Sequence, residues 1–197
     1  MKKLNPNYIV QKELNQDKWG SWQYNVRDEL KPLSVEEIKE HLTHNKLPCA
    51  VLMSQIEGDF NFSTIIRTSN NFNIECVYYY GKKRFDRRGT MGTHLYSEVK
   101  YLASLEEVVA LKNTYQFVAL ENNVPDCVPI KDFIYPTRPC ILLGEENSGL
   151  PSELLGMADF TVEIPSRGSV RSLNVASAAA IILYDFYVQK SGADRSA

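Results

Sequence analysis

The chain has 197 residues, of which 44% are hydrophobic and 23% are charged, and its formal net charge at pH 7 is -2. This composition is ordinary for a globular protein, and the length suits one domain with a short extension. The charge argues against indiscriminate binding to polyanions but is compatible with a local basic patch.

Capping signals and apolar periodicity predict helices and strands that alternate after a polar, partly irregular extension at residues 1–33. Three aromatic residues of this extension are expected to pack on the main domain: Trp19, Trp22 and Tyr24. Ser34 and Ser104 each stand three residues before a glutamate, which is the pattern of a capping box at a helix start. The expected elements are helices at 35–45, 61–72, 105–113, 152–157 and from 175, strands at 49–54, 74–80, 115–120, 140–143 and 160–164, and a basic loop at 81–94.

The last helix has apolar residues at the spacing of a packed face: Val175, Ala178, Ala179, Ile182, Leu183 and Phe186. Repeated strand–helix alternation predicts an α/β domain with a largely parallel sheet. The longest apolar stretch, 175–184, is too short to cross a bilayer, and residues 1–4 lead into polar sequence. We therefore expect no signal peptide and a cytoplasmic protein.

The cysteines and histidines do not form a metal-binding or disulfide pattern. The four cysteines are far apart and include no CxxC pair: Cys49, Cys76, Cys127 and Cys140. We expect buried, reduced thiols and no metal. The sequence also lacks GxGxxG, GxxxxGK[ST] and GxSxG, which removes the main support for NAD-binding, P-loop and hydrolase functions.

Three segments carry the functional signal: NFSTIIR at 61–67, LGEENSGL at 143–150 and IPSRGSVRSLNV at 164–175. The third is a polar loop between a strand and a helix, where backbone N–H and C=O groups are open to a polar ligand. From about residue 47 to 187 the chain resembles the SpoU/TrmH-type enzymes of the SPOUT superfamily. These enzymes transfer a methyl group from S-adenosylmethionine to a ribose 2′-hydroxyl of RNA. Ser63 stands where the family often has glycine, and Ser166 where it often has methionine.

The resemblance implies an α/β fold with a C-terminal trefoil knot, and a homodimer in which the last helix packs across a two-fold axis. It divides the chain into an N-terminal extension with one helix (1–46), a methyltransferase domain (47–190) and a flexible tail (191–197).

The resemblance also implies which residues bind S-adenosylmethionine, mainly through backbone groups, with Ile164 and Leu173 as apolar cover for the adenine. The implied cofactor residues are Leu120, Glu121, Gly144, Glu145, Ile164, Ser166, Gly168, Ser172 and Leu173. The alternative for Gly144, Gly149 and Gly168 is that they are ordinary turn glycines.

The implied catalytic residues are Arg67, Asn61, Glu146, Ser172 and Asn174. Arginine at the position of Arg67 is proposed as the base in relatives, but a guanidinium keeps its proton beyond about pH 12. Our hypothesis is that Arg67 grips a phosphate and stabilises developing alkoxide charge, while the two asparagines and Ser172 orient the ribose. Glu146 would pair with Arg67 or fix its loop; a plain ion pair between them is the alternative.

The basic loop is expected to contact RNA through five cations, Lys82, Lys83, Arg84, Arg87 and Arg88, with an aromatic ring for base stacking. The alternative is a solvated charged surface. For Trp19, Trp22 and Tyr24 of the extension, stacking on bases is the alternative to packing on the main domain. The RNA is expected to be tRNA or rRNA. Two other functions stay open: a catalytically silent RNA-binding dimer, and a methyltransferase that modifies a base.

Overall fold

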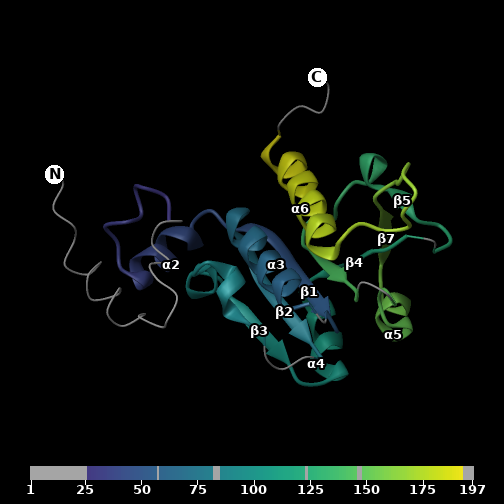
Figure 1. Cartoon of the computed structure of the whole chain (residues 1–197), viewed down its shortest axis with the longest axis horizontal. Coiled ribbons are helices and arrows are strands. Elements are labelled where there is room, and N and C mark those ends of the chain that lie inside the picture. Colours follow the sequence, from purple (N-terminus) through teal and green to yellow (C-terminus); the bar gives the residue numbers. More distant parts are fainter. Residues whose placement is uncertain (1–25, 57, 82–84, 123, 146–147, 193–197) are drawn as a thin grey trace.

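The computed structural model describes residues 26–56, 58–81, 85–122, 124–145 and 148–192. Within these residues, seven strands form one sheet in the order β3-β2-β1-β6-β4-β7-β5, and every strand pair is parallel (Figure 1). The strands are β1 (Leu47–Ser54), β2 (Ile74–Tyr80), β3 (Val99–Leu102), β4 (Gln116–Leu120), β5 (Val128–Pro129), β6 (Pro139–Leu143) and β7 (Phe160–Glu163). The expected α/β fold with a parallel sheet is confirmed.

The helices are α2 (Val35–Thr43), α3 (Asp59–Asn71), α4 (Leu105–Ala110), α5 (Ser152–Gly156) and α6 (Val175–Ser191). Short 3₁₀ turns are η2 (Arg87–Thr90), η3 (Thr93–Leu95), η4 (Leu111–Asn113) and η5 (Ile130–Asp132). All the expected helices are present, but the helix after Ser104 ends at Ala110 and continues only as η4. The loop predicted at 81–94 contains η2 and the start of η3.

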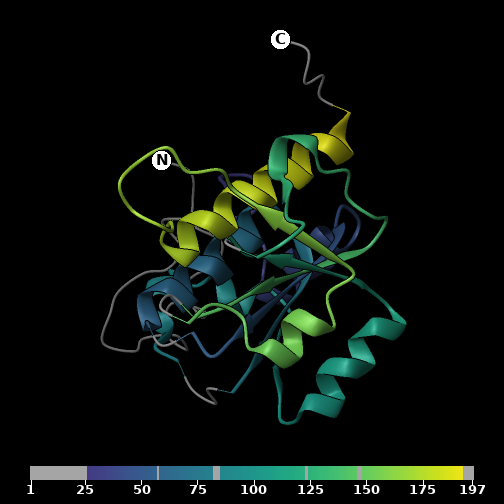
Figure 2. The same cartoon turned by 90° about the vertical axis from the view of Figure 1, so that its right-hand side faces the viewer.

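Helices cover both faces of the sheet, with α3 and α6 on one face and α4 and α5 on the other (Figure 2). Strands β1 and β6, at the centre, alternate their side chains between the two apolar cores. This burial on both faces explains why these strands are continuous apolar runs in the sequence.

The capping box at Ser34 is present in full: Ser34 Oγ accepts from the Glu37 N–H at 3.2 Å, and the Glu37 carboxylate accepts from the Ser34 N–H at 2.7 Å. At Ser104 only half of the box forms. Ser104 Oγ accepts from the Glu107 N–H at 3.4 Å, whereas the Glu107 carboxylate accepts from the N–H of Ala103 at 2.7 Å. Both serines still satisfy an otherwise unpaired donor of the first helical turn.

The buried face of α6 differs from the prediction at one position. Ala176 is buried, and Ala178 is only partly buried because the helix turns Ala176 towards the sheet and Ala178 towards a cavity. The rest of the predicted apolar face is buried as expected.

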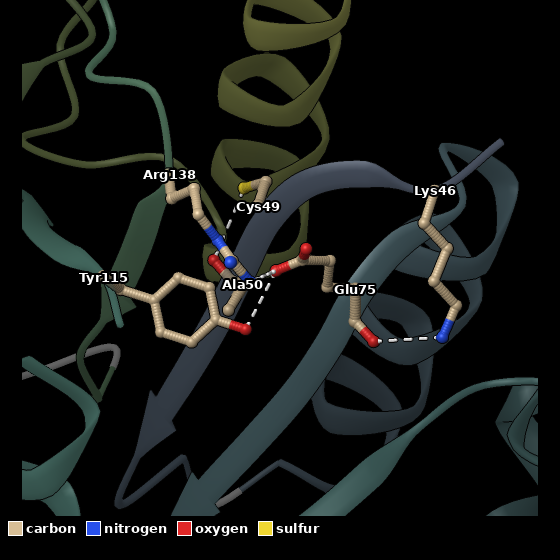
Figure 3. A network of polar contacts seen from close by, with 6 residues as sticks. All are labelled: Lys46, Cys49, Ala50, Glu75, Tyr115 and Arg138. Atoms are coloured by element: carbon tan, nitrogen blue, oxygen red, sulfur yellow. Dashed lines mark hydrogen bonds and ion pairs between the residues drawn. The ribbon is translucent and has the colours of Figure 1, made fainter. Parts of the chain in front are cut away.

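A polar network ties the strands together at the amino edge of the sheet (Figure 3). The Glu75 carboxylate accepts a hydrogen bond from Tyr115 Oη at 3.0 Å and from Arg138 at 2.7 Å, and Lys46 Nζ donates to the Glu75 carbonyl at 3.4 Å. Burial of the Tyr115 hydroxyl raises its pKa to about 12, and the hydrogen bond to the Glu75 carboxylate acts in the same direction. The network therefore holds β2 to the segments that enter β4 and β6, and it lies at the edge of the sheet opposite to the carboxyl ends of the strands.

The residues expected to anchor the N-terminal extension, Trp19, Trp22 and Tyr24, lie outside the described residues. The division at residues 46 and 190 and the trefoil knot stay predictions.

Candidate functional site

A cavity of about 670 Å³ lies at the carboxyl edge of the sheet, where β4, β6 and β7 end and α6 begins. Its volume is within the range of small-molecule sites. All the predicted cofactor residues except Gly168 line it: Leu120, Glu121, Gly144, Glu145, Ile164, Ser166, Ser172 and Leu173. Segments far apart in the sequence thus meet at one site, as expected at the carboxyl ends of parallel strands.

The turn after β6 is folded tightly on itself and on Glu121. Glu145 and Gly149 exchange two backbone hydrogen bonds, of 3.1 and 2.8 Å. The Glu121 carboxylate, at the end of β4, accepts from the N–H of Leu150 at 2.5 Å. The Glu145 carboxylate accepts from both the N–H and Oγ of Ser148 at 2.7 Å. The two glutamates are therefore held by the turn that they border.

Two glycines of this turn are required by close approach. A Cβ at Gly144 would stand 2.2 Å from the carbonyl carbon of Gly149, and a Cβ at Gly149 would stand 2.5 Å from Glu121 Oε1. Gly149 also has φ +72°, which favours glycine. Gly168 differs, because nothing lies within 4 Å of the place for its Cβ. Gly144 and Gly149 are turn glycines and cavity-lining residues at once.

The loop between β7 and α6 forms the outer wall of the cavity, and residues 165–174 are exposed. Asn122 Nδ2 donates to the Arg171 carbonyl at 2.7 Å, and Ser166 Oγ donates to the Val170 carbonyl at 3.3 Å. Sequence reasoning missed Asn122, although a polar residue directly after a strand of a parallel sheet is a usual signal for a site.

The structure brings together two of the predicted catalytic residues, Asn61 and Asn174. Asn174 is the N-cap of α6, and its Oδ1 accepts from the N–H groups of Ala176 and Ser177 at 3.0 and 3.3 Å. Its Nδ2 donates to Asn61 Oδ1 on α3 at 2.9 Å. A side chain that caps a helix is thus also bonded to the α3 segment singled out by sequence.

The other predicted catalytic residues have different surroundings. Ser172 lines the cavity. Arg67 lies exposed on α3, outside the lining set. Glu146 is outside the described residues.

The described part of the basic loop is anchored to α3. Ser63 is fully buried, and its Oγ donates to the carbonyl of Asp86. The Asp86 carboxylate accepts from the Arg88 N–H at 2.9 Å and from Arg88 Nε at 2.5 Å, and these bonds lower the pKa of Asp86. Arg87 and Arg88 are exposed; Lys82, Lys83 and Arg84 lie outside the described residues.

The cysteines are structural. Cys49, Cys76 and Cys140 are buried and Cys127 is half-buried, all as free thiols. Burial raises the pKa of Cys76 to about 11, and that of Cys140 well above its usual range. Thiolates are therefore scarce at neutral pH, which makes these residues poor nucleophiles. Among the described residues, no cluster of three or more His, Cys, Asp or Glu side chains is arranged to hold a metal ion.

The all-parallel sheet and the glycine-lined cavity at its carboxyl edge define an α/β protein with a small-molecule site. The model of the SpoU rRNA Methylase family matches residues 48–184, and the chain belongs to this family. None of the helices within the described ranges is long and apolar enough to cross a membrane.

Relatives and solved structures agree with this membership. The chain is 29% identical over 168 residues to the tRNA (guanosine(18)-2'-O)-methyltransferase of Escherichia coli (strain K12), covering 83% of this chain and 73% of the relative. The enzyme of that name from Aquifex aeolicus (strain VF5) is 28% identical over 79% of this chain and 76% of its own.

Among solved structures, the A. aeolicus TrmH/SpoU tRNA modifying enzyme has a TM-score of 0.72 at 27% identity, over 80% of this chain and 83% of that chain. The SpoU methyltransferase AviRb from Streptomyces viridochromogenes, in complex with the cofactor AdoMet, has a TM-score of 0.67 at 25% identity, over 74% and 58%.

Proposed function

We propose that this protein transfers a methyl group from S-adenosylmethionine to a ribose 2′-hydroxyl of RNA, and that this RNA is a tRNA. The observation that carries the proposal is that described residues of the 143–150 and 164–175 segments line the same cavity. Membership of the SpoU family supports the reaction. The names of the E. coli and A. aeolicus relatives support tRNA as the substrate.

The cavity fits S-adenosylmethionine in size and in chemistry. Gly144 and Gly149 bring the backbone of the turn to the cavity wall, which suits a ligand that is held mainly by main-chain groups. Ile164 and Leu173 supply apolar cover from the facing loop, and Glu121 and Glu145 place carboxylates at the rim. When bound, the cofactor supplies an electrophilic methyl group on a sulfonium.

We assign the ribose to the neighbourhood of Asn61 and Ser172. Asn174 is a positioning residue, because it fixes Asn61 through its amide while its carbonyl oxygen caps α6. Arg67 would grip a phosphate of the RNA and stabilise the developing alkoxide, since a guanidinium is a poor base near neutral pH. For Glu146 we keep the two roles expected from the sequence: it would form an ion pair with Arg67, or it would fix the conformation of its own loop.

Two partners complete the proposal. The cations of the basic loop, Arg87 and Arg88 with Lys82, Lys83 and Arg84, would bind RNA phosphates.

A second copy of the chain would cover the outer face of α6, where Ile181, Tyr184 and Tyr187 are exposed by 39%, 59% and 43%. A helix that is apolar on both faces is normally covered on both.

Calorimetric titration with S-adenosylmethionine tests the cofactor site. Because Ser172 lines the cavity, we expect the Ser172→Ala variant to bind up to about tenfold more weakly than the wild type, the effect of about one lost hydrogen bond. Val109→Ala is the matched control, because Val109 is exposed on α4, across the sheet from α6. A folded wild type that does not bind the cofactor would contradict the proposal.

Nucleoside analysis of the product tests the reaction. An unmodified tRNA transcript incubated with wild-type protein and labelled cofactor should yield a 2′-O-methylnucleoside and an alkali-resistant dinucleotide. Label on a nucleobase would replace the proposal by base methylation. Tight RNA binding without any label would replace it by the silent RNA-binding dimer.

A further inference from the structure

The basic loop was expected to offer an aromatic ring to a nucleobase, and Phe85 is the aromatic residue of that loop. In the structure this ring is already engaged. Phe85 stacks on Phe62 with ring centroids 4.4 Å apart, and meets Tyr79 edge-on at 5.8 Å. It is also packed against the apolar core. Phe85 is therefore part of the protein's own packing.

A different phenylalanine is open to the solvent at the same place. Phe60, in the first turn of α3, is 77% exposed, whereas Phe62 two residues later is buried. A single exposed apolar side chain does not by itself indicate a partner, so the role of this ring depends on what surrounds it.

The surroundings of Phe60 indicate a particular kind of partner. A Cβ placed at Gly89 would stand 3.8 Å from Phe60 Cδ1, so the ring borders the η2 turn of the basic loop. In the described part of that loop, the η2 turn itself carries two exposed cations, Arg87 and Arg88. An aromatic face beside a cationic loop is the usual combination for binding unpaired nucleotides, because the ring stacks on a base while the cations hold the backbone.

Phe60 is also next to the site of the proposed reaction. It directly precedes Asn61, which accepts a hydrogen bond from Asn174 at 2.9 Å. The buried hydroxyl of Ser63, one turn further along α3, holds the carbonyl of Asp86. The ring, the cationic turn and the Asn61–Asn174 pair are thus attached to one helix.

We propose that Phe60 stacks on a nucleobase of the RNA substrate adjacent to the ribose that is methylated. The inference rests on the proposed function for the identity of the RNA. Stacking accepts any base, so Phe60 would contribute to affinity and to the placement of the ribose, and would add little sequence preference.

The test measures fluorescence anisotropy of a labelled, unmodified tRNA transcript in the presence of S-adenosylhomocysteine. Phe60→Ala and Phe60→Leu should each bind about tenfold more weakly than the wild type, and Phe60→Tyr within about twofold of it. The leucine variant separates stacking from apolar contact, and Val109→Ala is the control. Cofactor affinity and molar mass should be unchanged in all variants.

The opposing results are distinct. Equal RNA affinity of the wild type and Phe60→Ala, or full affinity of Phe60→Leu, would refute the stacking of Phe60 on a base. Neither result would contradict the proposed methyltransferase function. A change of molar mass in Phe60→Ala would place the ring in a protein–protein interface and would also overturn it. A wild type that binds RNA but transfers no methyl group would refute the proposed function while leaving the stacking measurement intact. A wild type that does not bind RNA would overturn both.

Discussion

At the scale of single residues, Asn174 has two roles, because the oxygen and the nitrogen of its side-chain amide bind different groups. Its carbonyl oxygen satisfies two N–H groups at the start of α6, and its amide group reaches Asn61. Serine or aspartate caps a helix about as well, but neither has an amide N–H to give to Asn61. The need for both groups explains why an asparagine stands at this position.

Replacement of Asn174 by aspartate and by alanine should separate the two roles. Asn174→Asp keeps the cap, so the free energy of unfolding should stay close to that of the wild type, while methyl transfer falls at least about tenfold. Asn174→Ala should lose the activity and, in addition, about 1 kcal/mol of stability. Urea unfolding and a methylation assay check the pair. Full activity of both variants would show that the bond to Asn61 is not needed.

Gly144 and Gly168 provide a second matched pair. A methyl group at Gly144 would overlap the backbone of Gly149 and Leu150, whereas at Gly168 it would enter open space. We expect Gly144→Ala to cost about 1–3 kcal/mol or to displace the turn and lose cofactor binding, and Gly168→Ala to leave both properties unchanged. Urea unfolding and cofactor calorimetry measure this. A Gly144→Ala protein with native stability and affinity would mean that the turn relaxes freely.

At the scale of elements, the basic loop is joined to α3 by Ser63 and Gly89. A Cβ at Gly89 would lie 2.7 Å from the Cβ of Ser63, so the loop and the helix are in close contact. Ser63, which stands where the resemblance led us to expect glycine, contributes a hydroxyl that bonds the Asp86 carbonyl. In this chain the loop that is proposed to bind RNA is fixed to the helix of Asn61 and Arg67.

At the amino edge of the sheet, Asp159 joins the start of β7 to β4 and η4, and its carboxylate gives a pH-dependent prediction. Its carboxylate accepts from the Phe117 N–H at 2.7 Å and from Lys112 Nζ at 2.9 Å. Burial alone would raise the pKa of Asp159, but the hydrogen bonds outweigh it and lower the pKa below 3.8. A lowered pKa means that the contribution to stability is present above about pH 4 and is lost as the pH falls through the folded pKa.

Asp159→Asn should therefore be less stable than the wild type by about 1 kcal/mol at pH 7, and the difference should shrink below pH 4. Urea unfolding at pH 7, 5 and 3 measures the two proteins side by side. A difference that stays constant down to pH 3 would rule out the charged hydrogen bonds as its source.

At the scale of the whole molecule, α6 has two apolar faces and the described chain covers one. Ile182, Leu183 and Phe186 are buried against the sheet, while Ile181 and Tyr184 are exposed. The proposed homodimer would bury this second face next to the loop that lines the cavity.

Ile181→Glu should convert the protein to a monomer, because a carboxylate cannot be buried unpaired in an apolar interface. Light scattering should give twice 22.5 kDa for the wild type and for Val109→Glu, and 22.5 kDa for Ile181→Glu. Methyl transfer by Ile181→Glu should fall with the loss of the dimer. A wild type that is monomeric at the assay concentration would contradict this proposal.

The sequence predicts the fold well where local signals are strong and fails where contacts are distant. Capping serines and apolar runs located most of the helices and central strands. The edge strands β3 and β5, of 4 and 2 residues, were missed, although β7, also of 4 residues, was predicted. The motifs located most of the cavity lining, but no spacing rule predicts the Asn61–Asn174 bond across 113 residues. Nor does sequence distinguish Phe85, whose ring is packed, from Phe60, whose ring is exposed.

The bond between Asn61 and Asn174 can form only late during synthesis on the ribosome, because the two residues are far apart in the sequence. The two residues are 113 positions apart, and translation at about 5–20 residues per second separates their appearance by about 6–23 seconds. Until α6 has emerged and docked, the nascent chain has neither Asn174 nor the final wall of the cavity. The proposed site is therefore incomplete on a growing chain until α6 is in place.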